Sequence, residues 1–231
     1  MPTPFTPFTK LGKTIATRQL EYPEWHKGRT RYGIWALEID AVNILQRFHS
    51  AQQALADYLL PQYQRQPHIT LYVCGFLDWL EPKRLQANDN FSQNTLEQQH
   101  AKLSKELKEI TLAVTDFTLQ VGAIDSFSSA PYLQVTDPHQ HLSRLRTACT
   151  SLAEVNRSNE FRTSPYTPHL TLGLYRDSFD CRTLDNEFRR INRQHGFDAG
   201  LPLAVKALHF MSYASHCVGS PLRTELSLAG C

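Results

Sequence analysis

A short motif occurs twice in this chain. Residues 67–71 read Pro-His-Ile-Thr-Leu and residues 168–172 read Pro-His-Leu-Thr-Leu, which places the two histidines 101 positions apart (169 − 68). The β-branched and aromatic residues around the copies predict two buried strands, over residues 67–77 and 168–175. Any fold of this chain therefore has to accommodate two matching strands that carry the same polar residues.

Strand periodicity predicts where those polar residues point. Side chains alternate between the two faces of a strand, so His68 should point the same way as Thr70. By the same rule His169 should share a face with Thr171, while the leucines and isoleucine between and beyond them point into the core. If the two strands lie side by side, two imidazoles and two hydroxyls converge on one cleft.

This set of groups is suited to phosphodiester cleavage. One imidazole can take a proton from the attacking oxygen and the other can protonate the departing oxygen, because the ordinary histidine pKa lies near 6.5. Threonine hydroxyls can donate hydrogen bonds to the non-bridging phosphoryl oxygens, where negative charge gathers. We therefore expect His68 and His169 to be catalytic and Thr70 and Thr171 to bind the phosphate, without a metal ion or cofactor.

Hydrophobic periodicity and turn residues predict the other elements. Residues 1–30 show no period and are expected to form an irregular arm before one domain over residues 31–231. Asp40 and Asp137 are expected to be N-caps of the helices that follow them. The predicted elements are a strand at 32–39, a helix at 41–60, a polar loop at 84–94, a helix at 95–110, a hairpin over 117–136, a helix from Pro138 to near Asn156, a helix at 181–192 and a strand at 203–213. Their order indicates an α+β fold.

Composition limits the functional classes. The formal charge of +2 is small for a protein that coats nucleic acid, so a nucleotide or RNA end should be held at a local pocket. The basic clusters at residues 27–31 and 182–193 are interpreted as solvated surface. Five cysteines without C-x-x-C spacing suit a reducing compartment, and no run approaches the roughly 20 apolar residues of a membrane span. We expect a cytoplasmic protein without a membrane anchor or a stable protein partner.

The repeated His-x-Thr-x motif resembles that of the two-histidine phosphoesterase superfamily, and most closely its branch of RNA 2′,3′-cyclic phosphodiesterases, also called 2′-5′ RNA ligases. The resemblance extends over residues 31–228 and includes Gly75, seven positions after His68. It implies a bilobal, pseudo-twofold α+β fold, with central sheets, helices outside and the four motif residues in a cleft between the lobes. The chain departs from the bacterial branch in its 30 preceding residues and in Leu174, where an arginine is common; Arg176 follows two positions later.

Three tyrosines are further candidates for substrate binding. Tyr72 and Tyr166 flank the two motifs and could stack on a base, although packing in the fold is an alternative for either. Tyr72 has the strand parity of His68, which predicts that it faces the cleft. Tyr213 and the segment 219–223 resemble the closing strand and loop of the family. The His139-x-His141 pair is not expected to bind metal, because positions i and i+2 of a helix do not share a face.

Two other functions use the same residues. The site could cleave 2′,5′-linked oligonucleotides or trim RNA 3′ ends, with a ribose hydroxyl rather than water as nucleophile. Alternatively, the chain could be a non-catalytic module that binds nucleotides or RNA ends. Two titrating imidazoles are not needed for phosphate binding alone, so the sequence favours a phosphodiesterase acting on RNA-type 2′,3′-cyclic phosphates or related nucleotide phosphodiesters.

Overall fold

The computed structural model describes residues 8–17, 26–61, 63, 65–80, 90–113, 117–151, 166–215 and 219–229. The strands are β1 (Arg31–Glu38), β2 (His68–Leu77), β3 (Asn90–Phe91), β4 (Thr118–Ser126), β5 (Pro131–Thr136), β6 (His169–Thr171), β7 (Leu201–Ala204), β8 (Ala207–Ala214) and β9 (Arg223–Ala229). The α-helices are α2 (Val42–Ala54), α3 (Gln93–Ala113), α4 (His141–Thr150) and α6 (Cys181–His195), and short 3-10 turns are η1 (Phe8–Lys10), η3 (Ala56–Tyr58) and η4 (Asp78–Leu80).

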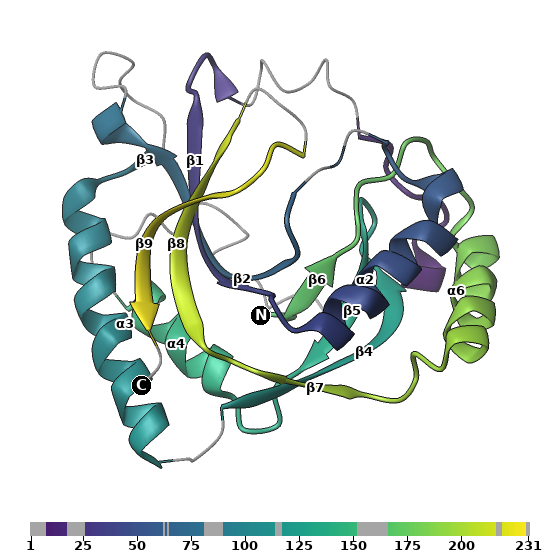
Figure 1. Cartoon of the computed structure of the whole chain (residues 1–231). Helices are drawn as coiled ribbons and strands as arrows, with labels where there is room; N and C mark the ends of the chain where they lie inside the picture. Colours follow the sequence, from purple (N-terminus) through teal and green to yellow (C-terminus); the bar gives the residue numbers. More distant parts are fainter. Residues whose placement is uncertain are drawn as a thin grey trace.

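The strands form one sheet in the order β7-β4-β5-β6-β2-β1-β8-β9, with β3 added beside β2. All neighbours are antiparallel except β2 and β3. The sheet has two halves that meet where β2 pairs with β6 (Figure 1). The predicted bilobal α+β architecture is confirmed, and its junction falls at the two motif strands.

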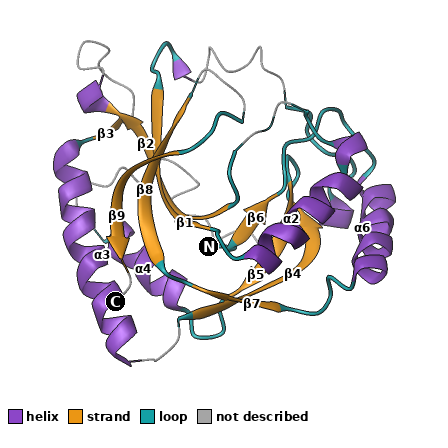
Figure 2. Cartoon of the chain, in the orientation of Figure 1, coloured by secondary structure: helices purple, strands orange, loops and turns teal. Residues whose placement is uncertain are grey.

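Helices cover the outside of each lobe (Figure 2). Helices α3 and α4 pack together beside β1, β2 and β8, whereas α2 and α6 lie over the strands β4 to β7. Helix α2 follows β1 in the chain but covers the other lobe, so the lobes exchange elements. The core extends through both halves and includes the fully buried side chains of Trp35, Phe48 and Tyr175.

A buried arginine fixes α2 to the second lobe. Arg47 is 8% exposed, and its guanidinium donates to the carbonyl oxygens of Val121 at 2.9 Å and Ala199 at 2.8 Å. The carbonyl of Phe197 accepts from the same group at 3.2 Å. These bonds satisfy carbonyls at the irregular part of β4 and in the turn after α6.

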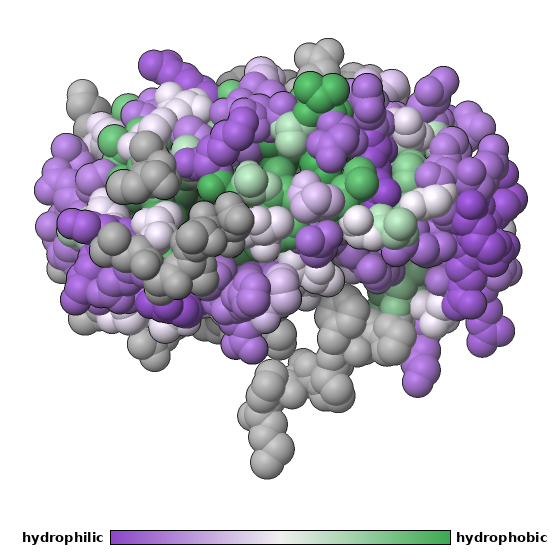
Figure 3. Space-filling view, turned by 60° about the horizontal axis from the view of Figure 1, so that its bottom comes forward, coloured by the Kyte–Doolittle hydropathy of each residue, from purple (hydrophilic) through white to green (hydrophobic). Residues whose placement is uncertain are grey.

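Helix α6 is the amphipathic cover of the second lobe. Its buried side includes Leu184, Phe188 and Ile191, and its outer side is strongly hydrophilic, as the right flank of Figure 3 shows. Residues 8–17 lie against this helix: the ring of Phe8 stacks on Phe188 with centroids 5.8 Å apart, and the backbone of Lys13 forms an isolated antiparallel β-bridge with that of Asp180. No α-helix in the described part of the chain is long and apolar enough to cross a membrane.

Several strand boundaries differ from the predictions. The apolar run 203–213 is two strands, because the chain passes at Val205 and Lys206 from β7 in one lobe to β8 in the other. The second motif strand is only β6, and residues 172–175 continue as irregular extended chain. Asn90 and Phe91 pair with β2, although a loop was predicted there. Strand β9 was missed because this exposed edge strand has a mixed polar sequence.

The predictions that Asp40 and Asp137 are helix N-caps were wrong. Ala41 is the N-cap of α2, and Asp40 instead forms an ion pair with Lys206 at 2.8 Å. Helix α4 begins at His141, after Gln140 in a left-handed conformation, so Asp137 lies outside the cap position. The Asp137 carboxylate still accepts from the backbone N–H of Leu142 at 2.7 Å and thus satisfies a first-turn donor. The predicted end of this helix near Asn156 falls outside the described residues.

Candidate active site

The pairing of β2 with β6 brings the two motifs together. The strands are antiparallel with Ile69 opposite Leu170, and both of these side chains are fully buried. This register places His68 opposite Thr171 and, one step along, Thr70 opposite His169. Side chains directly opposite each other have Cβ atoms about 4.5–5.5 Å apart. We call the side of the sheet that carries these four polar residues the motif face.

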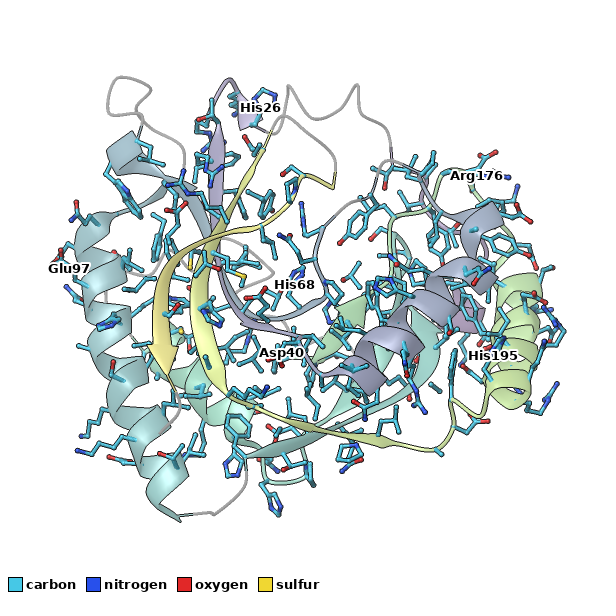
Figure 4. The ribbon with its side chains drawn as sticks, viewed as in Figure 1. His26, Asp40, His68, Glu97, Arg176 and His195 are labelled. Atoms are coloured by element: carbon cyan, nitrogen blue, oxygen red, sulfur yellow. The ribbon has the colours of Figure 1, made fainter. Side chains whose placement is uncertain are left out.

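The motif face lies where the two lobes join. Figure 4 shows His68 in the middle of the molecule, between the two halves of the sheet. The antiparallel pairing relates the two motifs by a local twofold axis, so each histidine has the threonine of the other motif as its cross-strand neighbour. The structure thus brings together all four polar residues that the sequence singled out.

Both imidazoles are anchored in the same way. The Nδ1 atom of His68 lies 2.8 Å from the carbonyl oxygen of Gln66, and Nδ1 of His169 lies 2.7 Å from the carbonyl oxygen of Thr167. A carbonyl only accepts, so Nδ1 carries the hydrogen in both rings. In the neutral form Nε2 then has a free lone pair, as a general base requires, and in the charged form Nε2–H is available as a general acid.

The two histidines are not electrostatically equivalent. His68 is 7% exposed, and burial lowers its pKa to about 4, with the charges of Arg65 and His169 acting in the same direction. Burial also lowers the pKa of His169, and the hydrogen bond to Thr167 opposes this shift. Both imidazoles are therefore neutral at pH 7 in the free protein. A phosphodiester anion bound between them would raise both pKa values.

The second lobe adds an aromatic and polar border to the site. Phe127 and Tyr132 lie against His169, with ring centroids 4.8 and 5.3 Å from the imidazole. Tyr132 is the β5 neighbour of Thr171, and Gln134 is the neighbour of His169. The Asp125 carboxylate accepts from the Gln134 side-chain amide at 3.0 Å. The sequence showed a hairpin here but gave no sign that β5 pairs with β6, so these residues were missed.

Tyr72 does not follow the parity of the first motif. Register shifts between β1 and β2 place Leu71 in an irregularity, so Thr70 and Tyr72 no longer share a face. Tyr72 is 1% exposed and packs in the main core, where it is the cross-strand neighbour of Trp35. The predicted orientation of Tyr72 was wrong, and we leave this residue out of the proposed site. Gly75, with φ of 115°, lies at the second shift, in a conformation that favours glycine.

Tyr166 contacts the strand of the first motif. Its hydroxyl donates to the carbonyl oxygen of Thr70 at 3.0 Å, and its ring lies 4.9 Å from the guanidinium of Arg146. Arg146 also donates to the carbonyl of Leu71 at 2.9 Å. Burial raises the pKa of the Tyr166 phenol, which is therefore neutral. These contacts tie the residue before the second motif to the strand of the first.

Tyr213 lies on the first lobe, in strand β8. It is the cross-strand neighbour of Tyr32, and the guanidinium of Arg65 lies 4.0 Å from its ring centroid. Arg176, the nearest arginine after the second motif, is exposed at the outer edge of the other lobe, away from His68 (Figure 4). Arg65 is thus the arginine whose charge acts on the first motif histidine.

Among the described residues, metal ligands do not gather near the motifs. Across the ranges that the structure describes, no three His, Cys, Asp or Glu side chains form a group that could hold a metal ion. His139 and His141 have ring centroids 5.6 Å apart at the start of α4. His141 is buried beside Phe117, and burial lowers its pKa, so the ring is neutral.

Two matching strands with His-x-Thr on one face, joined at the centre of a bilobal α+β fold, are the features of two-histidine phosphoesterases. The profile of the 2′-5′ RNA ligase superfamily matches residues 38–216, a range that includes both motifs and most of the chain. The chain belongs to this superfamily.

The chain is similar to several solved structures. TT0787 of Thermus thermophilus superposes with a TM-score of 0.52 at 11% identity, covering 86% of this chain and 97% of that protein. Escherichia coli LigT gives 0.49 at 15% identity, over 87% and 98%, and has also been crystallised with 3′-AMP. Usb1 of Kluyveromyces marxianus gives 0.45 at 13% identity, over 86% and 97%. Comparison with curated protein sequences gave no significant match.

Proposed function

We propose that this protein is a phosphodiesterase that opens RNA-type 2′,3′-cyclic phosphates, or cleaves related nucleotide phosphodiesters, with His68 and His169 as general base and general acid. The observation that carries the proposal is the shared anchoring of the two imidazoles. Each donates Nδ1–H to a backbone carbonyl, on adjacent antiparallel strands, and so keeps Nε2 for the substrate.

The two histidines divide the proton transfers. His68, the more deeply buried ring, is neutral because burial lowers its pKa to about 4, and it takes a proton at Nε2 from the attacking water. The water oxygen bonds to phosphorus, and the bond from phosphorus to one ribose oxygen breaks. Protonated His169 gives its Nε2 proton to that leaving oxygen, and the product is a nucleoside phosphomonoester. Proton exchange with solvent then restores both rings.

The threonines act on the phosphoryl group. Thr70 and Thr171 are cross-strand neighbours of the two histidines, and their hydroxyls can donate to the two non-bridging oxygens. Hydrogen bonds placed where negative charge increases are worth about 3–4 kcal/mol in the transition state at other enzymes. The partly exposed ring of Phe127 offers an apolar surface beside His169 for the nucleoside.

A substrate panel tests the proposal. Purified protein is incubated with 2′,3′-cyclic mononucleotides, 2′,5′-oligoadenylate and RNA ending in a cyclic phosphate, and the products are identified by mass and retention. Opening of the cyclic phosphates by the wild type and not by His68→Ala or His169→Ala is the expected result. Binding of these compounds without turnover would contradict the proposal and favour a non-catalytic module.

A further inference from the structure

A glutamine joins the first motif to the loop between β8 and β9. The side-chain amide of Gln66 donates to the carbonyl oxygen of Leu222 at 3.1 Å, and the backbone N–H of Leu222 donates to the Gln66 amide oxygen at 2.7 Å. Both ends of one side chain thus pair with both backbone groups of one residue. The segments lie 156 positions apart in the chain, so this contact is a tertiary constraint.

The backbone of the same glutamine holds a catalytic ring. The Gln66 carbonyl accepts the Nδ1–H of His68 at 2.8 Å. Gln66 precedes β2, and the ladder to β1 ends at Pro67, whose carbonyl accepts from Ile39 at 3.2 Å. The side chain of Gln66 therefore supplies a restraint at the point where the strand ladder stops.

The part of this loop next to Leu222 is itself held in place. The Ser220 hydroxyl accepts from the backbone N–H of Ala214 at 3.0 Å and lies 3.2 Å from the carbonyl of the same residue, which ties the loop to the end of β8. The Ser220 carbonyl accepts from the Arg65 guanidinium at 3.4 Å, and Arg65 packs on the ring of Tyr213. A continuous path of contacts thus runs from β8 through the loop and Gln66 to His68.

We propose that Gln66 is a positioning residue for His68: its side-chain amide, held by Leu222, fixes the carbonyl that sets the tautomer and orientation of the imidazole. This inference rests on the proposed function of His68 as a proton-transfer group. Its physical basis is that an acid or base displaced by about 1 Å from productive geometry loses on the order of a hundredfold in rate. The loop is then part of the catalytic framework although it lies far from the motifs in sequence.

The second motif provides an internal comparison. The carbonyl that holds His169 belongs to Thr167, and the adjacent Pro168 carbonyl accepts from Val135 of β5 at 3.3 Å. The strand on that side, β6, is flanked by β5. Loosening Gln66 should therefore disturb His68 and leave His169 unchanged.

The test uses Gln66→Met in the full-length protein. Methionine has almost the same length as glutamine but makes neither hydrogen bond to Leu222. The matched control is Gln53→Met, on the exposed side of α2. We measure kcat and KM with a 2′,3′-cyclic mononucleotide, thermal melting, and the ¹⁵N shifts of both imidazoles at pH 8, which report the tautomer.

The expected result is a kcat about 10–100-fold lower with KM changed less than about twofold. The His68 signal should move from the Nδ1–H form toward a mixture of tautomers, while the His169 signal stays. A folded Gln66→Met protein with an unchanged His68 tautomer, or with unchanged kcat, would overturn the inference; so would a rise in KM alone.

Two safeguards keep the outcome decisive. If Gln66→Met does not fold, Gln66→Glu is measured instead, because it keeps the acceptor for the Leu222 N–H and loses the donor to the Leu222 carbonyl. The His68 signal should then move part of the way from the Nδ1–H form, and a signal identical to that of the wild type would overturn the inference. If no substrate is turned over by the wild type, the proposed function fails, yet the ¹⁵N comparison of His68 with His169 still tests whether Gln66 positions the ring.

Discussion

The pH dependence of the reaction is the sharpest consequence of the site. The general base has to be neutral, so kcat/KM rises with pH through the pKa of that group in the free enzyme. The general acid has to be protonated, so kcat/KM falls as pH rises through its pKa. The pKa of His68 is about 4, and burial places the pKa of His169 below its ordinary value of 6.5. We therefore expect a bell-shaped profile with its maximum below pH 6.5.

The size of the decline at alkaline pH follows from the same values. Above the pKa of the acid, kcat/KM falls tenfold for each pH unit. The ordinary histidine pKa of 6.5 is the upper limit for the pKa of His169, and pH 8 lies 1.5 pH units above it. At pH 8, kcat/KM should therefore be at least about thirtyfold below its maximum. The assay is kcat/KM for one 2′,3′-cyclic mononucleotide from pH 3.5 to 9, with thermal melts across the range as control. A rate at pH 8 as high as at pH 5.5 would refute the reasoning that burial sets these pKa values.

Four further results are expected. Replacing His68 or His169 by Ala should each lower kcat/KM about 10²–10⁴-fold, and the double variant should be little worse than the worse single one, because the two groups act as a unit. Thr70→Ala and Thr171→Ala should each lower kcat about 10–10³-fold if each hydroxyl donates to the phosphoryl group. Activity should survive a strong chelator, and restoration of lost activity by a divalent ion would contradict this mechanism. Arg47→Met should lower the free energy of unfolding, measured in urea, by about 3–5 kcal/mol, because it leaves buried carbonyls unsatisfied.

Exposed residues of the same types give matched controls. His195→Ala on α6 and Thr147→Ala on α4 remove the same groups far from the motif face and should leave kcat/KM within about twofold of the wild type. His195 lies at the outer edge of the second lobe (Figure 4). A motif variant that melts several degrees below the wild type is uninformative about catalysis, so each kinetic value is read beside a melting curve.

The repeated motif predicted the central part of the site, because the orientation of these residues depends only on the local periodicity of each strand. Buried Ile69 and Leu170 fix the orientation of each strand, and the polar residues on either side then share a face. The same rule failed at Tyr72, only two positions further, because an irregularity in the pairing with β1 reversed the alternation. Nothing in the sequence of a single strand shows where its partner will insert such a shift.

Long-range pairing accounts for most of what the sequence left out. Tyr132 and Gln134 border the site only because β5 pairs with β6, across a connection of more than 30 residues. The run 203–213 has one continuous apolar pattern, but its halves serve different lobes. The restraint of His68 by Gln66 likewise depends on a contact with Leu222, in a loop near the C-terminal end of the chain. Such contacts are decided by how whole elements pack, and single-sequence patterns do not contain that information.

The local symmetry of the site raises the question of why the two histidines should differ at all. Two identical anchors on antiparallel strands would make either ring equally suited to be base or acid. The surroundings of the two rings differ. His68 is buried beside the charge of Arg65, which disfavours its protonated form, whereas His169 lies against the rings of Phe127 and Tyr132. In the proposed mechanism, residues outside the repeat therefore set the direction of proton transfer. Arg65→Met should raise the pKa of His68, seen in an imidazole titration by NMR, and move the acid limb of the rate profile to higher pH. An acid limb that stays in place would show that burial alone distinguishes the two histidines.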